Sequence, residues 1–440
     1  MFPVTEMSPV HSGPAAHIRE RRLIGPAAFT VVVPKDNDAE RILRLDAYSA
    51  AMAFIRGQVS IDGDLSAAIR YFLGQPTGQL RRLHQMALAR CSRSRLAAWA
   101  RTRSVTARQV SFHYDRSNEF YAQFLDSRMV YSCAYFRSAD VPLEEAQLAK
   151  LDYICRKLSV LPGERFLDVG CGWGGLLIRC AERYGAQATG CTVSSCQAQY
   201  VRDLINSRGL QAKTSLCEND YRDMTGQYDK IASVGMFEHE GKHRLGQYFR
   251  RIHALLQDDG LFLNHGIVRP ENVKDGPETL FLQREVFPGG ELVSLSDVVR
   301  QAGEAGFEVL DIENVRPHYA LTCRAWAQRL QHNADQCRRL IGETAYRTWL
   351  LFITASALSF EDGVTDVFQV LLAKRRRKTQ RRLTRDYLYT NRLPVQKLRP
   401  RMACDPDAPH CAAQEATKPR PEPAPLPNSA EYDHTVDILL

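Results

Sequence analysis

A glycine-rich turn, residues 170–175 (Gly-Cys-Gly-Trp-Gly-Gly), directly follows an apolar run at 165–169 and precedes a helix-compatible stretch at 176–183. After the first strand of an open α/β sheet, a turn of this kind is where nucleotides bind, because glycine lets the backbone approach a ligand closely. The first turn of the following helix also presents free N–H groups. The spacing fits both G-x-G-x-x-G and G-x-G-x-G, so it predicts a nucleotide-type ligand without choosing one.

The residues after the next predicted strand narrow that choice. A dinucleotide-binding unit usually has a carboxylate about twenty residues beyond the glycines, where it binds the ribose. This chain instead has Thr192-Val193-Ser194-Ser195-Cys196-Gln197, with hydroxyl and amide groups and no acid. A dinucleotide is therefore the less favoured ligand.

Apolar strand-like runs alternate with helical stretches from residue 112 to about residue 374. This alternation predicts an α/β domain built on a mainly parallel sheet. The predicted strands lie at 165–169, 187–193, 229–235, 261–268, 307–312 and 366–372.

Changes in composition divide the chain into five parts. Residues 1–28 lack hydrophobic periodicity and are predicted to be a disordered leader, and 29–80 to form a small N-terminal domain with turns at its glycines. A basic connector helix is expected at 81–107 and the catalytic domain at 108–375. The remainder, 376–440, is first basic and then rich in proline, with prolines at every second position from Pro419 to Pro427, so it is expected to be disordered.

The formal net charge of +8 is concentrated in a basic cluster, residues 374–385, which contains eight Lys and Arg residues. Such a run predicts either an anionic partner, such as nucleic acid or the surface of a bilayer, or simply a solvated tail. No apolar stretch is long enough for a membrane span, and charged residues interrupt the N-terminus where a signal peptide needs an apolar run. The twelve cysteines include no C-x-x-C pair, which favours a reducing cytoplasm and no metal site.

Several longer motifs carry a family resemblance. They are His113-Tyr114-Asp115, the run 131–136 (Tyr-Ser-Cys-Ala-Tyr-Phe), the run 167–175, the T-x-S-x-x-Q pattern at 192–197, and the run 235–239 (Gly-Met-Phe-Glu-His). In this order they resemble the cyclopropane-fatty-acyl-phospholipid synthases and the related mycolic acid cyclopropane synthases. The resemblance covers roughly 113–373; residues 50–65 also look like that family's N-terminal domain, whereas the C-terminal tail has no match.

The resemblance implies a seven-stranded, Rossmann-like S-adenosylmethionine methyltransferase fold with a small N-terminal α+β domain. In this family the T-x-S-x-x-Q run stands where a dinucleotide-binding fold has its acid. The residues that the resemblance assigns to S-adenosylmethionine are Tyr131, Ser132, Asp168, Gly170, Gly172, Gly174, Thr192, Ser194, Gln197, Asp220 and Tyr221.

The resemblance further implies an active-site anion, bicarbonate, held by Cys133 and Ile267 through their backbones and by the side chains of Glu238, His265 and Tyr319. An alkene is a poor nucleophile, so its methylation needs the sulfonium of S-adenosylmethionine and a site that excludes water from the resulting cation. A base must then remove a proton from the new methyl group to close the ring. An anion bound by Glu238, His265 and Tyr319 fits this task if Glu238 accepts a hydrogen bond and the other two donate.

The expected activity is cyclopropanation of unsaturated acyl chains in phospholipid, by a cytoplasmic enzyme that is peripheral on the inner face of the membrane. Two alternatives stay open: a fatty-acyl methyltransferase of the same fold that leaves a methyl branch, and a lipid-binding relative without activity. Nucleic acid is not an expected partner, because the basic cluster lies outside the catalytic domain and lacks interleaved aromatic residues. A homodimer is left open.

Overall fold

The computed structural model describes residues 20–23, 28–33, 45–74, 117–273, 281–286, 291–375 and 383–389. The statements below concern these residues. The predicted connector helix at 81–107 and nearly all of the predicted tail lie outside them.

The N-terminal part folds as a three-stranded antiparallel sheet with two helices. The sheet has the order β1-β2-β3, and the elements are β1 (Glu20–Leu23), β2 (Phe29–Val33), α2 (Ala47–Ile55), β3 (Ser60–Gly63) and α3 (Leu65–Leu73). Asp46 and Asp64 cap the two helices by accepting hydrogen bonds from the backbone N–H groups of Ser49 and Ser66. The sheet thus begins at Glu20, inside the predicted leader. The sequence of this edge strand, Glu-Arg-Arg-Leu, has no apolar alternation, as is usual for an edge.

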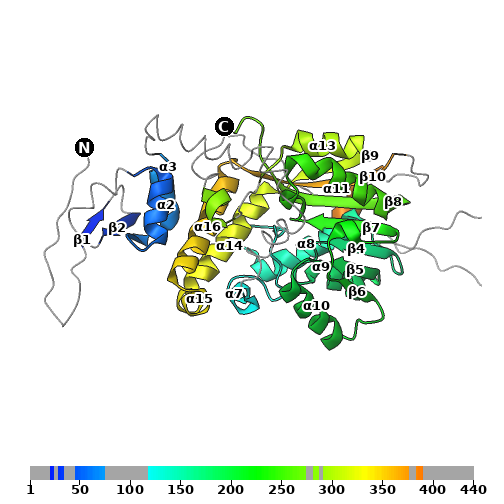
Figure 1. Cartoon of the computed structure of the whole chain (residues 1–440), viewed down its shortest axis with the longest axis horizontal. Coiled ribbons are helices and arrows are strands. Elements are labelled where there is room, and N and C mark those ends of the chain that lie inside the picture. Colours follow the sequence, from blue (N-terminus) through cyan, green and yellow to red (C-terminus); the bar gives the residue numbers. More distant parts are fainter. Residues whose placement is uncertain are drawn as a thin grey trace, which may run out of the picture. The chain divides into compact units, whose positions relative to one another are not determined.

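A seven-stranded sheet forms the centre of the catalytic domain (Figure 1). Its order is β6-β5-β4-β7-β8-β10-β9; the first five strands are parallel, and β10 runs antiparallel to both of its neighbours. The strands are β4 (Arg165–Val169), β5 (Gln187–Cys191), β6 (Thr214–Cys217), β7 (Tyr228–Val234), β8 (Leu256–Val268), β9 (Phe307–Asn314) and β10 (Asp366–Lys374). This arrangement is the predicted α/β methyltransferase fold.

Helices cover both faces of this sheet, because its central strands are apolar on both sides. On β4, the side chain of Phe166 packs with α8 to α10, while that of Leu167 packs with α11 and α13. The helices on the two faces are α8 (Leu143–Lys157), α9 (Gly175–Tyr184), α10 (Ser195–Ser207), α11 (Gly241–Leu255) and α13 (Leu295–Glu304).

Further helices build an apolar layer over the carboxyl ends of the strands. Its core includes Phe120, Phe124, Trp326 and Trp349, whose rings contact one another or Tyr131. The elements of this layer are α7 (Asn118–Ala122), α14 (Arg316–His332), α15 (Ala334–Ile341) and α16 (Glu343–Glu361). Three short helices, η2 (Tyr221–Asp223), η3 (Phe237–His239) and η4 (Leu282–Val286), pack in other parts of the core. No helix in the described ranges is both long and apolar enough to cross a membrane.

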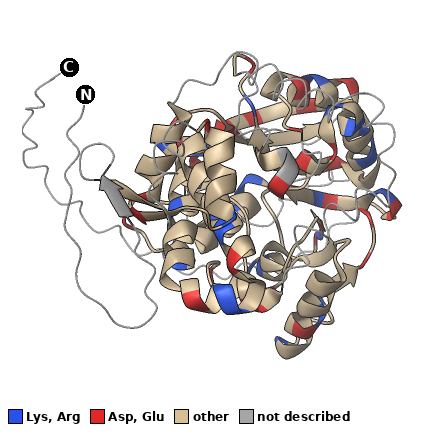
Figure 2. Ribbon diagram, turned by 60° about the vertical axis from the view of Figure 1, so that its left-hand side comes forward, with Lys and Arg blue, Asp and Glu red and all other residues tan. Residues whose placement is uncertain are grey.

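Basic and acidic residues are interspersed along the described helices (Figure 2). Several pair, as Arg338 and Arg347 do with Glu343 at the start of α16. Part of the predicted tail also has structure. Helix α17 (Asp386–Tyr389) buries Leu388, whose carbonyl accepts a hydrogen bond from Arg156 of α8. Described structure therefore also occurs beyond the predicted boundary at residue 375, at 383–389.

Candidate active site

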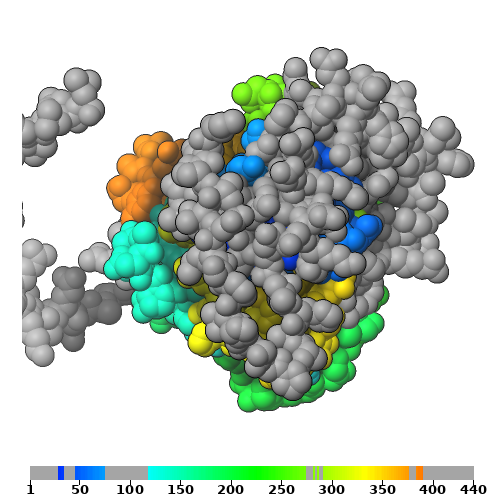
Figure 3. All heavy atoms as spheres, turned by 90° about the vertical axis from the view of Figure 1, so that its left-hand side faces the viewer, coloured from blue at the N-terminus to red at the C-terminus, as the bar shows by residue number. Residues whose placement is uncertain are grey.

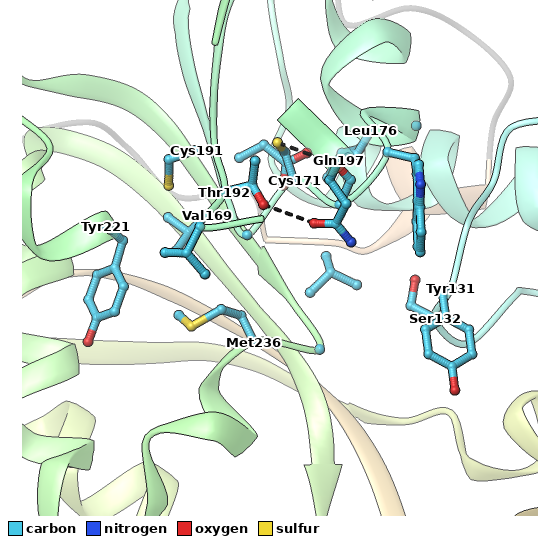
Figure 4. A pocket seen from close by; sticks show the side chains of 18 of the residues that line it. Tyr131, Ser132, Val169, Cys171, Leu176, Cys191, Thr192, Gln197, Tyr221 and Met236 are labelled. Atoms are coloured by element: carbon cyan, nitrogen blue, oxygen red, sulfur yellow. Dashed lines mark hydrogen bonds between the residues drawn. The ribbon is translucent and has the colours of Figure 1, made fainter. Parts of the chain in front are cut away.

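Because β4 to β8 are parallel, the loops after their carboxyl ends meet at one edge of the sheet. A cavity of about 160 Å3 lies there (Figure 4). Tyr131 and Ser132 line one side and Tyr221 lies on the other. The predicted cofactor residues that line this cavity are Tyr131, Ser132, Asp168, Gly170, Gly172, Thr192, Gln197, Asp220 and Tyr221.

The glycine turn has the backbone that its sequence predicts. Gly170, Gly172 and Gly174 all have positive φ, at 75°, 55° and 82°, which favours glycine. A Cβ on Gly172 would meet no atom within 4 Å, so a side chain has room at this position, and Gly172 lines the cavity. Gly174 does not line the cavity; it caps α9, and a Cβ there would press on Val201 at 3.1 Å.

The T-x-S-x-x-Q run positions one polar group in the cavity wall. The hydroxyl of Thr192 donates to Oε1 of Gln197 at 2.9 Å, so the amide nitrogen of Gln197 points away from Thr192 (Figure 4). Ser194 does not line the cavity; its Oγ accepts from the backbone N–H of Gln197 and caps α10. Ser194 thus fixes the start of the helix that carries Gln197.

Asp220 and Tyr221 form the far wall, at the end of β6. Both carboxylate oxygens of Asp220 accept hydrogen bonds from Arg222, and the carboxylate also caps η2. Tyr221 is buried against Tyr248. The Asp220 carboxylate therefore reaches the cavity as one half of an ion pair.

Two residues of α8 that the sequence interpretation did not single out hold the Tyr131–Cys133 segment. Gln147 donates to the carbonyl of Ser132 at 2.9 Å, and Nζ of Lys150 donates to its hydroxyl at 2.8 Å. Both are buried, and burial lowers the pKa of Lys150 to about 8. Burial likewise raises the pKa of nearby Asp168 to about 7. Polar residues three apart on the apolar face of a helix are the signal that could have identified this pair.

A second cavity, of about 250 Å3, adjoins the first; it is called the reaction cavity here. Four residues line both cavities: Tyr131, Ser132, Gly235 and His239. Helices α14 and α16 contribute nine further wall residues, most of them apolar, and the rest of the wall comes from other segments and includes the charged residues Arg269 and Glu291. All five residues assigned to the anion line it, namely Cys133, Glu238, His265, Ile267 and Tyr319. The structure therefore brings this predicted set together next to the cofactor cavity.

Three buried polar side-chain atoms of residues that line the reaction cavity have no hydrogen-bond partner among the residues that the structure describes: Nε1 of Trp326, and one atom each of Glu238 and His265, which belong to the predicted anion site. Glu238 accepts a hydrogen bond from the backbone N–H of Ile267 through Oε1, at 2.7 Å, while its Oε2 has none. His265 contacts the amide of Gln369 through Nδ1, at 3.1 Å, while its Nε2 has none. Since an unpaired buried polar atom costs about 1–3 kcal/mol, such a pair indicates a place for a polar ligand.

Burial also sets the charge of these groups. It raises the pKa of Glu238 to about 7 and lowers that of His265 to about 3 and that of His239 to about 4. Both histidines are thus neutral at physiological pH, and a neutral His265 with Nδ1 accepting from Gln369 carries its proton on Nε2. Burial raises the pKa of the Cys133 thiol, which argues against a thiolate nucleophile. Two further residues belong to the site: His239, to which the sequence interpretation gave no role beyond the 235–239 motif, and Gln369, which it did not name.

We expect turnover to fall as the pH drops below about 7, because Glu238 then loses its carboxylate. With one group of that pKa, kcat at pH 6 should be about tenfold below its plateau. The measurement is kcat at saturating S-adenosylmethionine and lipid, since protonation of Asp168 is expected to act on cofactor affinity. A kcat that stays constant down to pH 5.5 would contradict this assignment.

Comparison with known proteins gives the family. The sequence model of the family described as mycolic acid cyclopropane synthetase matches residues 101–370, more than half of the chain. The chain belongs to this family. A protein named "Probable fatty acid methyltransferase" from Pseudomonas putida is 36% identical over 360 residues, or 80% of this chain and 89% of the relative. Cyclopropane mycolic acid synthase 3 of Mycobacterium tuberculosis is 37% identical over 60% of this chain and 96% of its own.

Solved structures of mycolic acid cyclopropane synthases have the same fold. The cyclopropane synthase MmaA2 from Mycobacterium tuberculosis has a TM-score of 0.59 with 33% identity, covering 61% of this chain and 98% of its own. Mycolic acid cyclopropane synthase CmaA1, in complex with SAH and CTAB, has a TM-score of 0.58 with 35% identity and the same coverage. As a member of this family, the chain is an S-adenosylmethionine-dependent methyltransferase.

Proposed function

We propose that the protein converts cis double bonds in the acyl chains of phospholipids into cyclopropane rings. The observation that carries this proposal is the pair of unpartnered polar atoms, Glu238 Oε2 and His265 Nε2, in an apolar cavity beside the cofactor cavity. An apolar cavity suits an acyl chain. Two convergent polar atoms, one an acceptor and one a donor, suit proton removal beside it.

The cofactor cavity fits S-adenosylmethionine. When bound, this cofactor supplies an activated methyl group, and the protein positions it and excludes water. Gly172 leaves space for close approach, and Gln197, Ser132 and Tyr131 offer polar atoms in the walls. The two cavities share wall residues, so a methyl donor in the first would lie beside an acyl chain in the second.

The orphaned atoms also fit bicarbonate, which would accept the proton released on ring closure. The Glu238 carboxylate would accept a hydrogen bond from its hydroxyl, and the neutral His265 would donate one through Nε2. Tyr319, which stacks on Phe360 with ring centroids 4.5 Å apart, is held at the same cavity and offers a phenolic donor. Apolar neighbours such as Trp326 and Phe360 would keep water from the cationic carbon.

The decisive experiment is to incubate purified protein with S-adenosylmethionine and vesicles of cis-unsaturated phospholipid, and then to analyse the acyl chains. A ring and a methylene branch add the same mass, so NMR of the ring protons is required. Ring protons support the proposal, whereas a branched product would indicate the alternative methyltransferase. Unchanged acyl chains across varied lipid compositions, with normal cofactor binding, would favour a lipid-binding protein.

We also propose that the basic cluster, 374–385, attracts the enzyme to anionic bilayers. Its two ends pair with the catalytic domain, Lys374 with Asp258 at 3.2 Å and Arg385 with Asp311 at 2.5 Å. Replacing the residues between them by glutamine, at 376–378, 381 and 382, should weaken binding to anionic vesicles at low salt by at least about tenfold. Each basic residue contributes on the order of 1 kcal/mol near such a surface.

High salt should remove this difference, because it screens the attraction. Turnover on detergent-dispersed lipid should not change, since these residues lie outside the family match at 101–370. The comparison is made by vesicle sedimentation. Equal binding of the two proteins at low salt would show that the cluster is only a solvated segment.

A further inference from the structure

A third cavity, of about 270 Å3, lies between the N-terminal part and α16, and is called the outer chamber here. Its walls come from α2, α3 and α16, and include Ala51, Phe54, Ile69, Leu351 and Leu358. N-terminal residues, in blue, and residues of the α14 to α16 region, in yellow, appear on the same face of the molecule (Figure 3). The family match begins at residue 101, so the walls contributed by α2 and α3 lie outside it.

The outer chamber meets the reaction cavity across α16. Four residues line both spaces: Phe281, Ala355, Ser359 and Val364. Ala355 and Ser359 are one helical turn apart on the same face of α16, and their small side chains leave room there. The hydroxyl of Ser359 bonds to that of Thr365 at 2.9 Å, so it offers no unsatisfied group to an apolar ligand that crosses between them.

Polar contacts fix the chamber walls to each other. Arg347 of α16 donates to the carbonyls of Phe54 and Val59 at 3.0 and 2.8 Å, and Arg70 of α3 pairs with Asp362 at 2.5 Å. Within the described ranges, none of the buried side-chain N or O atoms that lack a partner belongs to the chamber. An occupant without hydrogen-bonding groups therefore fits it, because burying polar groups there would leave them unpaired.

We infer that the outer chamber receives the methyl-terminal segment of the acyl chain, beyond the reacting double bond, and so sets which chain lengths are used. This inference rests on the proposed function. The double bond must lie in the reaction cavity, beside the cofactor, so one end of the chain continues from there. The other end carries an ester and a headgroup, whose polar atoms would have no partners in the chamber. The N-terminal part thus acts as a determinant of chain-length specificity.

The test fills the chamber without touching the reaction cavity. Ala51→Leu places a larger side chain in the wall on α2, and Ala47→Leu does so one turn earlier. Ala67→Leu is the matched control, because Ala67 lies on α3 outside the chamber wall. The substrates are phospholipids that carry a cis-9-tetradecenoyl, cis-9-hexadecenoyl or cis-9-octadecenoyl chain, which differ only beyond the double bond.

Ala51→Leu should lower kcat/KM for the octadecenoyl lipid at least about tenfold, a typical effect of a methylene that no longer fits. For the tetradecenoyl lipid the change should stay below about twofold, and Ala67→Leu should match the wild type on all three. Ala47→Leu should shift the preference in the same direction, which provides a second measurement if Ala51→Leu folds poorly.

Two results would overturn the inference while the proposed function stands. In the first, the wild type converts all three lipids, and both chamber variants show the same relative kcat/KM values for them as the wild type. In the second, the effect of the variants depends on the length of the other, saturated acyl chain of the same phospholipid, which would place that chain in the chamber. If instead the wild type modifies none of the lipids, the proposed function itself fails.

Discussion

Replacing Glu238 by glutamine should lower kcat by about a hundredfold or more, the usual effect of losing a positioned proton-transfer group. Glutamine can still accept the hydrogen bond from the backbone N–H of Ile267, at 2.7 Å in the wild type, so the local backbone should be kept. The atom in place of Oε2 then becomes an amide donor instead of a carboxylate acceptor. Affinity for S-adenosylmethionine, measured by calorimetry, should not change, because Glu238 does not line the cofactor cavity.

His265→Ala should behave alike, and the double variant should lose much less than the product of the two effects, since both residues hold one ligand. Removing dissolved bicarbonate should slow the wild type and leave Glu238→Gln nearly unaffected. Glu164→Gln is a matched control and should keep wild-type activity. This buried glutamate also accepts a hydrogen bond from a backbone N–H, that of Leu161, but it lies at the amino end of β4, whereas the cofactor cavity lies at the carboxyl end. Full activity of Glu238→Gln with normal bicarbonate dependence would place proton removal elsewhere.

Much of the central fold could be predicted from sequence, because its strands are continuous apolar runs with turn residues on either side. The predicted strand at 165–169 matches β4 to the residue, and those at 229–235 and 366–372 overlap β7 and β10. Strand β6 was not predicted, since Thr-Ser-Leu-Cys is short and half polar. Strand β1 and helix α17 lie in segments that are predicted to be disordered, the first because residues 1–28 lack hydrophobic periodicity and the second because the tail is basic and then rich in proline.

The sequence predicts those site residues that belong to a motif or to the family resemblance. It does not predict residues that reach the site only through contacts between segments far apart in the sequence. Nothing in a single sequence places Gln369 opposite His265, because that contact depends on β10 lying beside β8 in one register. The same holds for Lys150, which reaches Ser132 only after α8 packs on the sheet. The outer chamber depends on the docking of α2 and α3 against α16, which no local pattern reports.

The structure also distinguishes two kinds of motif residue that cannot be told apart in the sequence. Gly172 lines the cavity, whereas Gly174 and Ser194 do not and instead cap α9 and α10. The spacing of a motif therefore indicates that a turn is present, but the ligand-facing atoms follow from the backbone path. A substitution at Gly172 is thus the more direct test of where the cofactor binds.

Gly172→Val should weaken binding of S-adenosylmethionine and of its demethylated product by at least about tenfold, measured by calorimetry. At a φ of 55° a β-branched residue is strained by roughly 1–2 kcal/mol, and its side chain would occupy the space that the ligand needs. Gly209→Val separates these causes: Gly209 has a φ of 64°, also has no atom within 4 Å of a built Cβ, and lies after α10, away from the cavity. If backbone strain alone caused the effect, both variants would lose the same affinity for S-adenosylmethionine. Wild-type affinity in a folded Gly172→Val protein would show that the cofactor does not bind at this turn. Loss in Gly172→Val only, with the same fall in melting temperature in both, would assign the effect to ligand contact.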